Sequence, residues 1–222
     1  MVEARCVAFD IDDTLYLERD YVRSGLRAVG ERCRRELGIE GFFDRAVEAF
    51  DTGVRRTIFD HVLATYGIED RPELVRSLVD VFRSHDPEIR LAPDALDCLE
   101  RLHGHVALAA VSDGPASSQH AKATALGLRA WLDPILITED LGPEYWKPNA
   151  RAFQLVQTET GCMGGQCVYV ADNPGKDFAG PKALGWKTVR VRRSGSLHYE
   201  AESCSCVDVE IGDLAGLEVQ HL

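Results

Sequence analysis

The chain has 222 residues, of which 45% are hydrophobic and 27% charged, and its formal net charge is −11. An acidic protein repels nucleic acids and anionic lipids on average, and a phosphorylated substrate would need a cation within the binding site. No apolar run approaches the roughly 20 residues of a membrane span, and the N-terminus lacks a signal-peptide pattern. We therefore expect a cytoplasmic protein with a small-molecule partner and with neither nucleic acid nor membrane as a partner.

The seven cysteines are an odd number in a chain of ordinary length, which does not indicate a disulfide framework. Three of them fall at apolar positions of expected elements and are interpreted as buried hydrophobes: Cys6, Cys33 and Cys98. The remaining four have C-x4-C and C-x-C spacings, a poor match to the usual zinc ligands: Cys162, Cys167, Cys204 and Cys206.

The first expected strand is the apolar run at residues 6–10, and residues 18–89 follow it with a different pattern. Their apolar side chains recur every three or four positions, which is typical of amphipathic helices. Three such stripes are visible, at residues 22–37, 43–62 and 74–82. A βαβ crossover rarely needs three helices, so we expect residues 18–89 to form an inserted helical cap. The alternative is that these helices pack directly on the sheet.

Residues 90–222 alternate strands and helices and are expected to form one core with residues 1–17. Four further apolar runs are expected to be strands: 106–113, 134–138, 167–172 and 187–192. Helical patterns that end on glycine lie next to them, at 93–104, 117–127, 149–161 and 176–185. The tail at 204–217 is expected to add an edge strand and a short helix. Such alternation predicts an α/β fold, a doubly wound, Rossmann-like parallel sheet with helices on both faces.

Carboxylate, hydroxyl and ammonium side chains follow the expected strands. In open parallel sheets, ligands bind outside the carboxyl ends of the strands, so these side chains are expected to share one site. They are Asp10, Asp12, Thr14, Ser112, Asp113, Lys147, Asp172, Asn173 and Asp177, with Gly114 beside Asp113. Asp13 is expected to form a turn and not to act as a ligand. Clustered carboxylates need a countercharge, and hard divalent cations prefer carboxylate oxygen. The pattern therefore predicts Mg²⁺ and a phosphate ester as its ligand.

Four segments in this set resemble the motifs of the haloacid dehalogenase superfamily in its phosphatase form. DIDDTL at 10–15 is similar to the first motif, D-x-D-x-T, and AAVSDG at 109–114 to the second. WKPNARAF at 146–153 resembles the third motif, and VADNPGKD at 170–177 the fourth, with paired acids on one loop. All four occur in the family's order, and the helical insert matches members with a type 1 cap.

The resemblance implies roles in phosphoryl transfer. Asp10 would be the nucleophile that forms an aspartyl-phosphate. Asp12 would protonate the leaving alcohol and then activate water, and Thr14 would orient the loop or this acid. Ser112 would hold the phosphoryl oxygens, and Lys147 would neutralise the phosphoryl charge.

The resemblance also implies the binding groups around these residues. Backbone N–H groups of Asp113 and Gly114 would assist Ser112 at the phosphate. The metal would be held by carboxylates and one backbone carbonyl. The implied metal residues are Asp10, Asp12 through its carbonyl, Asp172 and Asp177. Of these, Asp177 would act, like Asn173, from behind the direct ligands or through water.

Two departures from the family pattern occur. Ala171 stands where glycine often precedes the fourth-motif acid, and Asp113 stands where asparagine is more usual. An extra carboxylate at position 113 would raise the electrostatic cost of binding phosphate.

Asp12 favours phosphoryl transfer over dehalogenation, because a leaving halide needs no proton. The expected function is a Mg²⁺-dependent phosphatase of a small phosphate ester, such as a sugar phosphate or nucleotide. A sugar phosphomutase, a dehalogenase and a non-catalytic phosphometabolite-binding protein are the alternatives. Substrate contacts are expected from Tyr16, Arg19, Arg55 and Arg56, although a solvated helix face explains the two arginines of the insert equally well.

Overall fold

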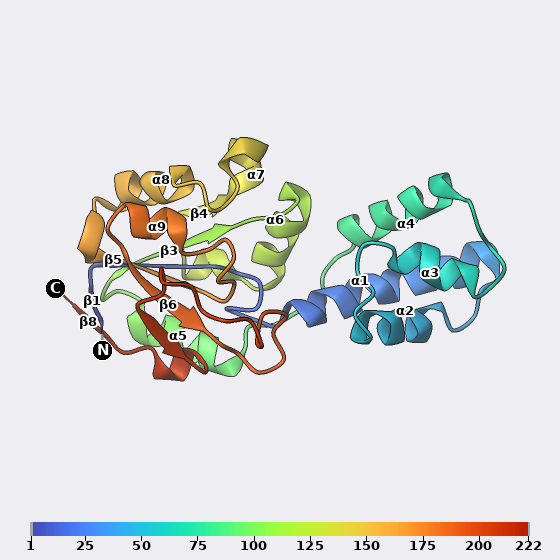
Figure 1. Ribbon diagram of the computed structural model, residues 1–222, viewed down its shortest axis with the longest axis horizontal. Helices are drawn as coiled ribbons and strands as arrows, with labels where there is room; N and C mark the ends of the chain where they lie inside the picture. Colours follow the sequence, from blue (N-terminus) through green and yellow to red (C-terminus); the bar gives the residue numbers. More distant parts are fainter. Residues whose placement is uncertain (1, 222) are drawn as a thin grey trace. The chain divides into compact units, whose positions relative to one another are not determined.

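The computed structural model describes residues 2–221 and divides the chain into two compact units (Figure 1). One unit contains the chain up to Arg19 and from Ile89 onward, and the other contains Asp20–Glu88. The bounds expected from the sequence for the insert were 18 and 89. No helix in the described part of the chain combines the length and apolar composition that crossing a membrane requires.

A six-stranded sheet forms the centre of the first unit. Its strands are β2 (Cys6–Phe9), β3 (Ala107–Ser112), β4 (Ile135–Ile137), β5 (Cys167–Ala171), β6 (Lys187–Val191) and β7 (Val209–Ile211). They lie in the order β4-β3-β2-β5-β6-β7, and every neighbouring pair is parallel. The expected doubly wound α/β fold is therefore confirmed.

The central strands are near-continuous apolar runs because helices cover both of their faces. Every residue of β2 and of β5 is buried. Figure 1 shows α8 (Arg151–Thr160) and α9 (Ala179–Ala183) on one side of the sheet and α5 (Pro93–Leu102) on the other. Phe153 of α8 packs edge-on against Trp186, with ring centroids 5.6 Å apart, within a buried apolar cluster of this unit.

The first unit contains further helical elements. They are α6 (Ala116–Ala125), η2 (Leu128–Ala130), α7 (Thr138–Leu141), η3 (Pro143–Tyr145), η4 (Gly164–Gln166) and η5 (Leu214–Gly216). The sequence did not indicate the separate parallel pair of β1 (Val2–Ala4) and β8 (Val219–His221). Strands of three residues are too short to display an alternating pattern, so only the pairing itself reveals them.

The second unit is helical around its own apolar cluster. Its elements are α1 (Glu18–Arg32, which begins in the first unit), the π-helix η1 (Cys33–Leu37), α2 (Phe42–Asp51), α3 (Ile58–Ala64) and α4 (Pro72–Ser84). The expected single stripe at 43–62 was wrong, because it is divided between α2 and α3. Val54 in the intervening turn still packs against the apolar cluster, so the helical spacing continues across a break that periodicity does not mark.

Candidate active site

The site lies at the carboxyl end of β2, where the sheet order reverses between β3 on one side and β5 on the other. Asp10 directly follows β2, and its N–H donates to the carbonyl of Val170 at 2.9 Å, which extends the ladder by one residue. Ser112 ends β3, and Asp172 directly follows β5. Three segments far apart in sequence thus end side by side at the switch point.

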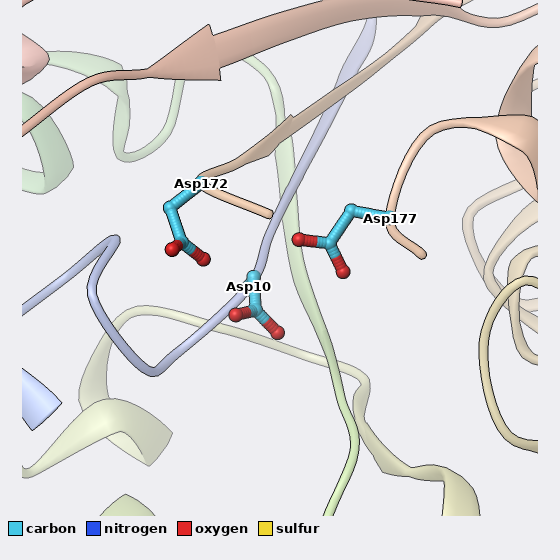
Figure 2. Close-up of side chains that lie close together, drawn as sticks. All are labelled: Asp10, Asp172 and Asp177. Carbon is cyan, nitrogen blue, oxygen red and sulfur yellow. The ribbon is translucent and has the colours of Figure 1, made fainter. Parts of the chain in front are cut away.

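Three buried carboxylates face one another there. Figure 2 shows the side chains of Asp10, Asp172 and Asp177 close together, and each offers an oxygen within 4.8 Å of the others. Burial, followed by repulsion from its neighbours, raises the pKa of Asp172 to about 9. Burial also raises the pKa of Asp10, to about 6, even with Lys147 opposing the shift.

The donor set of this cluster fits a hard divalent cation. Oδ2 of Asp172 is buried and has no hydrogen-bond partner among residues 2–221. A buried oxygen of this kind is costly unless something binds it, and carboxylate oxygens are the ligands that Mg²⁺ prefers. It is the sole group of three or more histidine, cysteine or acidic side chains gathered within metal-binding reach in the described residues. The four-cysteine zinc site, weighed as an alternative, is therefore not formed within residues 2–221.

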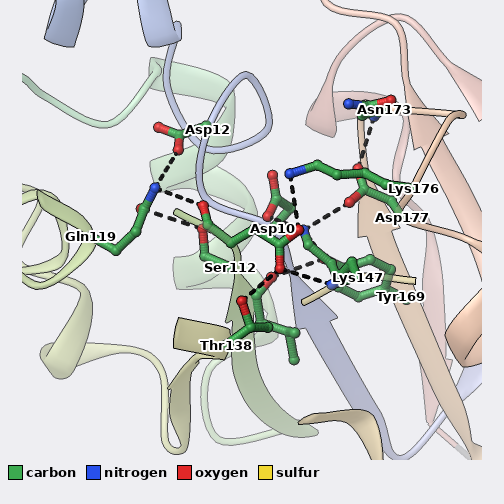
Figure 3. Close-up of polar contacts among 12 residues, drawn as sticks. Asp10, Asp12, Ser112, Gln119, Thr138, Lys147, Tyr169, Asn173, Lys176 and Asp177 are labelled. Atoms are coloured by element: carbon green, nitrogen blue, oxygen red, sulfur yellow. Dashed lines mark hydrogen bonds and ion pairs between the residues drawn. The ribbon is translucent and has the colours of Figure 1, made fainter. Parts of the chain in front are cut away.

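Lys147 supplies the positive charge of the site. Its Nζ lies 2.7 Å from Oδ1 of Asp10, 2.7 Å from Oδ1 of Asp177 and 3.1 Å from the hydroxyl of Tyr169 (Figure 3). Burial lowers the pKa of this lysine, but the carboxylates of Asp10 and Asp177 outweigh it and raise the pKa well above its usual value. Lys147 is therefore held as an ammonium group among the acids.

The fourth-motif loop is closed by its own side chains. Oδ2 of Asp177 accepts from the N–H of Asn173 at 2.9 Å. The side chain of Asn173 contacts the ring of His198 and accepts from the N–H of Gly175. Asn173 thus shapes the loop, while Asp177 both caps it and reaches Lys147.

Asp12 points to a different set of partners. Its carboxylate accepts from the hydroxyl of Tyr16, from Nε2 of Gln119 at 2.8 Å and from Nζ of Lys122 at 2.7 and 2.8 Å. Burial raises the pKa of Asp12, but the Lys122 ammonium and these donors outweigh it, so the pKa is lowered.

Thr14 was expected to orient either the loop or this acid, and within residues 2–221 its hydroxyl makes no hydrogen bond to Asp12. Oγ1 of Thr14 is buried without a hydrogen-bond partner in the described residues. The backbone carbonyl of Thr14 instead accepts from Arg193 at 2.9 Å, so the loop is oriented through its main chain.

The carboxylate of Asp113 has a hydroxyl, a backbone N–H and an ammonium group as partners. Its carboxylate accepts from Oγ1 of Thr138 at 2.7 Å and from the N–H of Lys147 at 3.1 Å, and it forms an ion pair with Lys176 at 3.1 Å. Burial raises the pKa of Asp113, but Lys147 and Lys176 lower it below its usual value. The electrostatic cost expected of a carboxylate at this position is therefore offset by two ammonium groups.

Glycine is required at position 114 because the Gln119 side chain lies close to where a Cβ would be. Its φ is +136°, and a Cβ at this position would lie 2.6 Å from Nε2 of Gln119. Only glycine combines that backbone conformation with so close an approach. Ser112 lies beside it and donates to Oε1 of Gln119 at 3.3 Å.

The remaining substrate-binding candidates differ in surroundings. Tyr16 is buried and contacts Asp12, and Arg19 is half-buried near the start of α1. Arg55 belongs to the helical unit, where its guanidinium donates to the carbonyl of Phe50 and lies 3.9 Å from the centroid of the Phe50 ring. Arg56 is exposed in the same turn.

The sequence interpretation missed several side chains that reach these acids. They are Gln119, Lys122, Thr138, Tyr169 and Lys176. Lys176 lies within the fourth motif, so its place in that segment was a usable signal. No sequence signal distinguishes Gln119 and Lys122 from solvated residues of a helix.

This fold, with buried carboxylates and an ammonium group at its switch point, defines an α/β enzyme with a carboxylate-centred active site. The haloacid dehalogenase-like hydrolase family matches residues 4–185. The chain belongs to this family of hydrolases, which confirms the resemblance drawn from the four motifs.

Curated relatives cover most of the chain. A glyceraldehyde 3-phosphate phosphatase of Methanopyrus kandleri is 31% identical over 85% of this chain and 84% of its own length. A ribulose-1,5-bisphosphate 5-phosphatase of Halopiger xanaduensis is 30% identical over 84% of each chain. Among solved structures, the magnesium-bound HAD-hydrolase YfnB of Bacillus subtilis aligns with a TM-score of 0.69, at 20% identity over 96% of both chains. This last similarity concerns the fold.

Proposed function

We propose that the protein is a Mg²⁺-dependent phosphatase that hydrolyses a small phosphate monoester through an aspartyl-phosphate. The main support is the meeting of Asp10, Asp172 and Asp177, where Oδ2 of Asp172 is buried without a hydrogen-bond partner in the described part of the chain. A phosphate ester bound beside a cation would occupy such a site without leaving the carboxylates uncompensated.

In the first half-reaction, a carboxylate oxygen of Asp10 attacks phosphorus, and the bond from phosphorus to the ester oxygen breaks. Asp12 donates a proton to that oxygen, so the product leaves as an alcohol. In the second half-reaction, Asp12 takes a proton from water, whose oxygen attacks the phosphoryl group. Phosphate leaves, and the Asp10 carboxylate is regenerated.

The binding residues act by position and charge. Ser112 and the backbone N–H groups of Asp113 and Gly114 hold the phosphoryl oxygens, and Lys147 neutralises their charge. In phosphoryl transfer, positioning and charge neutralisation account for most of the rate enhancement.

Asp10, Asp172 and the backbone carbonyl of Asp12 would hold Mg²⁺, with Asp177 bound directly or through water. The ion would neutralise charge on the phosphoryl oxygens. Asp177 is in the carboxylate cluster but is also committed to Lys147 and to the N–H of Asn173, which favours the water-mediated role.

The proposed substrate is a phosphorylated sugar or a related small metabolite. The two curated relatives described above are named for a triose phosphate and a pentulose bisphosphate. Tyr16, Arg19 and Arg55 are the candidates for contacts with the rest of the substrate. Of these, Tyr16 is the best supported, because its hydroxyl contacts the acid that faces the leaving group.

The test is phosphate release from a panel of monoesters that includes p-nitrophenyl phosphate, triose and pentose phosphates and nucleotides. We expect Mg²⁺-dependent release by the wild-type enzyme and a loss of more than about a thousandfold in Asp10→Asn. Asp140→Asn, at a half-exposed carboxylate paired with His120, is the matched control and should retain activity. Release of chloride from 2-chloropropionate without phosphatase activity would instead favour a dehalogenase, and interconversion of sugar phosphates without net release would favour a mutase. Binding of a phosphate ester with neither would favour a non-catalytic protein.

A further inference from the structure

Gln119 and Lys122 are buried polar residues on α6 that have no role in the mechanism described so far. Their side chains are three positions apart and therefore lie on the same face of the helix. Gln119 is 2% exposed and Lys122 is 3% exposed. A lysine is almost never buried to this degree unless an anion accompanies it, and here the Asp12 carboxylate lies 2.7 Å from its ammonium group.

Donors surround the Asp12 carboxylate. Nζ of Lys122 lies 2.7 Å from Oδ1 and 2.8 Å from Oδ2, Nε2 of Gln119 lies 2.8 Å from Oδ2, and the hydroxyl of Tyr16 donates to Oδ1. Each carboxylate oxygen thus has two donors. The carboxylate cannot turn about its Cβ–Cγ bond without breaking these contacts, because they come from both the loop and the helix.

Gln119 also connects this carboxylate to the strand end beside it. Its Nε2 donates to the carbonyl of Asp113 at 2.9 Å, and its Oε1 accepts from Oγ of Ser112 at 3.3 Å. Figure 3 shows the amide between Asp12 and Ser112. One face of α6 therefore sets the direction of Asp12 relative to the place where the phosphoryl group is proposed to bind.

We propose that Lys122 and Gln119 are positioning residues that aim the Asp12 carboxylate at the oxygen of the leaving alcohol. This inference rests on the phosphatase function proposed above. Proton transfer by a positioned acid contributes on the order of 10²–10⁴-fold, and a misplacement of about 1 Å costs on the order of 10²-fold. Neither residue needs to contact the substrate, because each acts through Asp12.

The dependence of kcat/KM on the leaving group tests this role. An alkoxide needs a proton to leave, whereas p-nitrophenolate leaves without one. For Lys122→Met, we expect kcat/KM to fall by about 10- to 100-fold with alkyl phosphates and by less than about threefold with p-nitrophenyl phosphate. Lys122→Arg should restore part of the loss, because it keeps a cation at the carboxylate. Gln119→Leu should show the same selectivity with a smaller loss, and it keeps the inference testable if Lys122→Met does not fold.

A second measurement separates positioning from packing. In an Asp12→Asn background, Lys122→Met should cause no further selective loss, because the group through which it acts has been replaced. Lys182→Met is the matched control, since Lys182 also forms an ion pair with an aspartate, Asp208, in the same unit. It should leave the leaving-group dependence unchanged.

Equal losses across all leaving groups, or losses that multiply in the Asp12→Asn background, would show a packing role and overturn the inference while the phosphatase proposal stands. A wild-type enzyme that releases no phosphate from any ester would overturn both proposals. The two failures are therefore distinguishable in the same set of assays.

Discussion

The ammonium group of Lys147 lies 2.7 Å from Oδ1 of Asp10, and the lysine side chain has no solvent-exposed surface. The same ammonium lies 2.7 Å from Oδ1 of Asp177, so two buried carboxylates share one cation. Such an arrangement fixes the position of the Asp10 carboxylate and makes the stability of the fold depend on the lysine. A single substitution at this lysine should therefore affect the free energy of unfolding as well as the site.

Replacing Lys147 should therefore reduce both stability and activity. Lys147→Met leaves two buried carboxylates without their cation, and breaking a buried pair in this way costs about 3–5 kcal/mol. Urea unfolding at neutral pH should show this loss. Phosphate release should fall by more than about a hundredfold.

Lys182→Met is the control for this substitution. The pair of Lys182 with Asp208 is more than a third exposed on both sides, and pairs of this kind contribute about 0–1 kcal/mol. If Lys147→Met were no more destabilising than Lys182→Met, the buried carboxylates would not depend on the lysine for compensation.

Removing divalent cations should abolish phosphate release, and adding Mg²⁺ should restore it. Binding should also be visible without any substrate. Mg²⁺ at about a hundred times its Kd stabilises the folded state by about 2.7 kcal/mol, which corresponds to a rise in Tm of about 5–10 °C. The Tm measured with and without Mg²⁺ after treatment with a chelator checks this.

Asp172→Asn should have opposite effects on the Tm without Mg²⁺ and on the rise in Tm that Mg²⁺ causes. Without a metal, burial and the neighbouring carboxylates raise the pKa of Asp172 to about 9, so folding at neutral pH requires this carboxyl group to take up a proton. An amide avoids that cost, so the Tm of the metal-free protein should rise. The increase caused by Mg²⁺ should be lost. If adding Mg²⁺ raised the Tm of Asp172→Asn as much as that of the wild type, the ion would bind at another place.

Gly180 allows α9 to approach the segment that carries Lys147. A Cβ at this position would lie 2.6 Å from the carbonyl oxygen of Pro148 and 3.2 Å from Cε2 of Phe153. Gly180→Ala should destabilise the protein by about 1–3 kcal/mol because backbone must move, although alanine is ordinarily better than glycine in a helix. It should also lower kcat, because Lys147 directly precedes the displaced residue.

Gly165→Ala is the corresponding control. A Cβ at Gly165 has no atom within 4 Å, and we expect a neutral or slightly stabilising effect at this position. Thermal unfolding and kcat of the two variants, measured side by side, separate close packing from a general effect of replacing glycine.

The ion pair of Asp94 with Arg193 should make stability depend on pH. The guanidinium donates to both carboxylate oxygens at 2.7 Å, and the N–H of Leu214 donates to Oδ2 at 2.8 Å. Burial raises the pKa of Asp94, but these donors outweigh it and lower the pKa. Arg193 in turn donates to the carbonyl of Thr14, so the pair supports the loop after Asp10.

A lowered folded-state pKa means that the contribution of Asp94 is complete above its unfolded pKa of about 3.9 and is lost as pH falls through the lower folded value. At pH 7, Asp94→Asn should reduce the free energy of unfolding by about 2 kcal/mol. The difference between wild type and variant should shrink as pH falls below about 4. Urea unfolding across this range checks both statements. Asp97→Asn, at an exposed position of the same helix, should change stability by less than about 0.5 kcal/mol at any pH.

Local patterns of apolar and polar residues predicted much of the fold and part of the candidate site. The strands at Cys6–Phe9 and Cys167–Ala171 could be predicted because burial on both faces demands continuous apolar runs. The meeting of Asp10, Ser112 and Asp172 followed from the rule that parallel strands end at one edge. The break between α2 and α3 could not be predicted, because Val54 continues the apolar spacing through the turn.

The sequence by itself determined the alternation of strands and helices, the helical insert and the acids that follow the strands. Strands and helices are visible as periodic apolar patterns, and the acids are visible because they directly follow apolar runs. Only the tertiary structure decided which cation compensates which acid. Lys122 and Asp12 are 110 residues apart, and Lys147 and Asp10 are 137 residues apart. A buried lysine on a helix has the same letter and spacing as a solvated one, so its partner is visible only after the sheet has brought the two segments together.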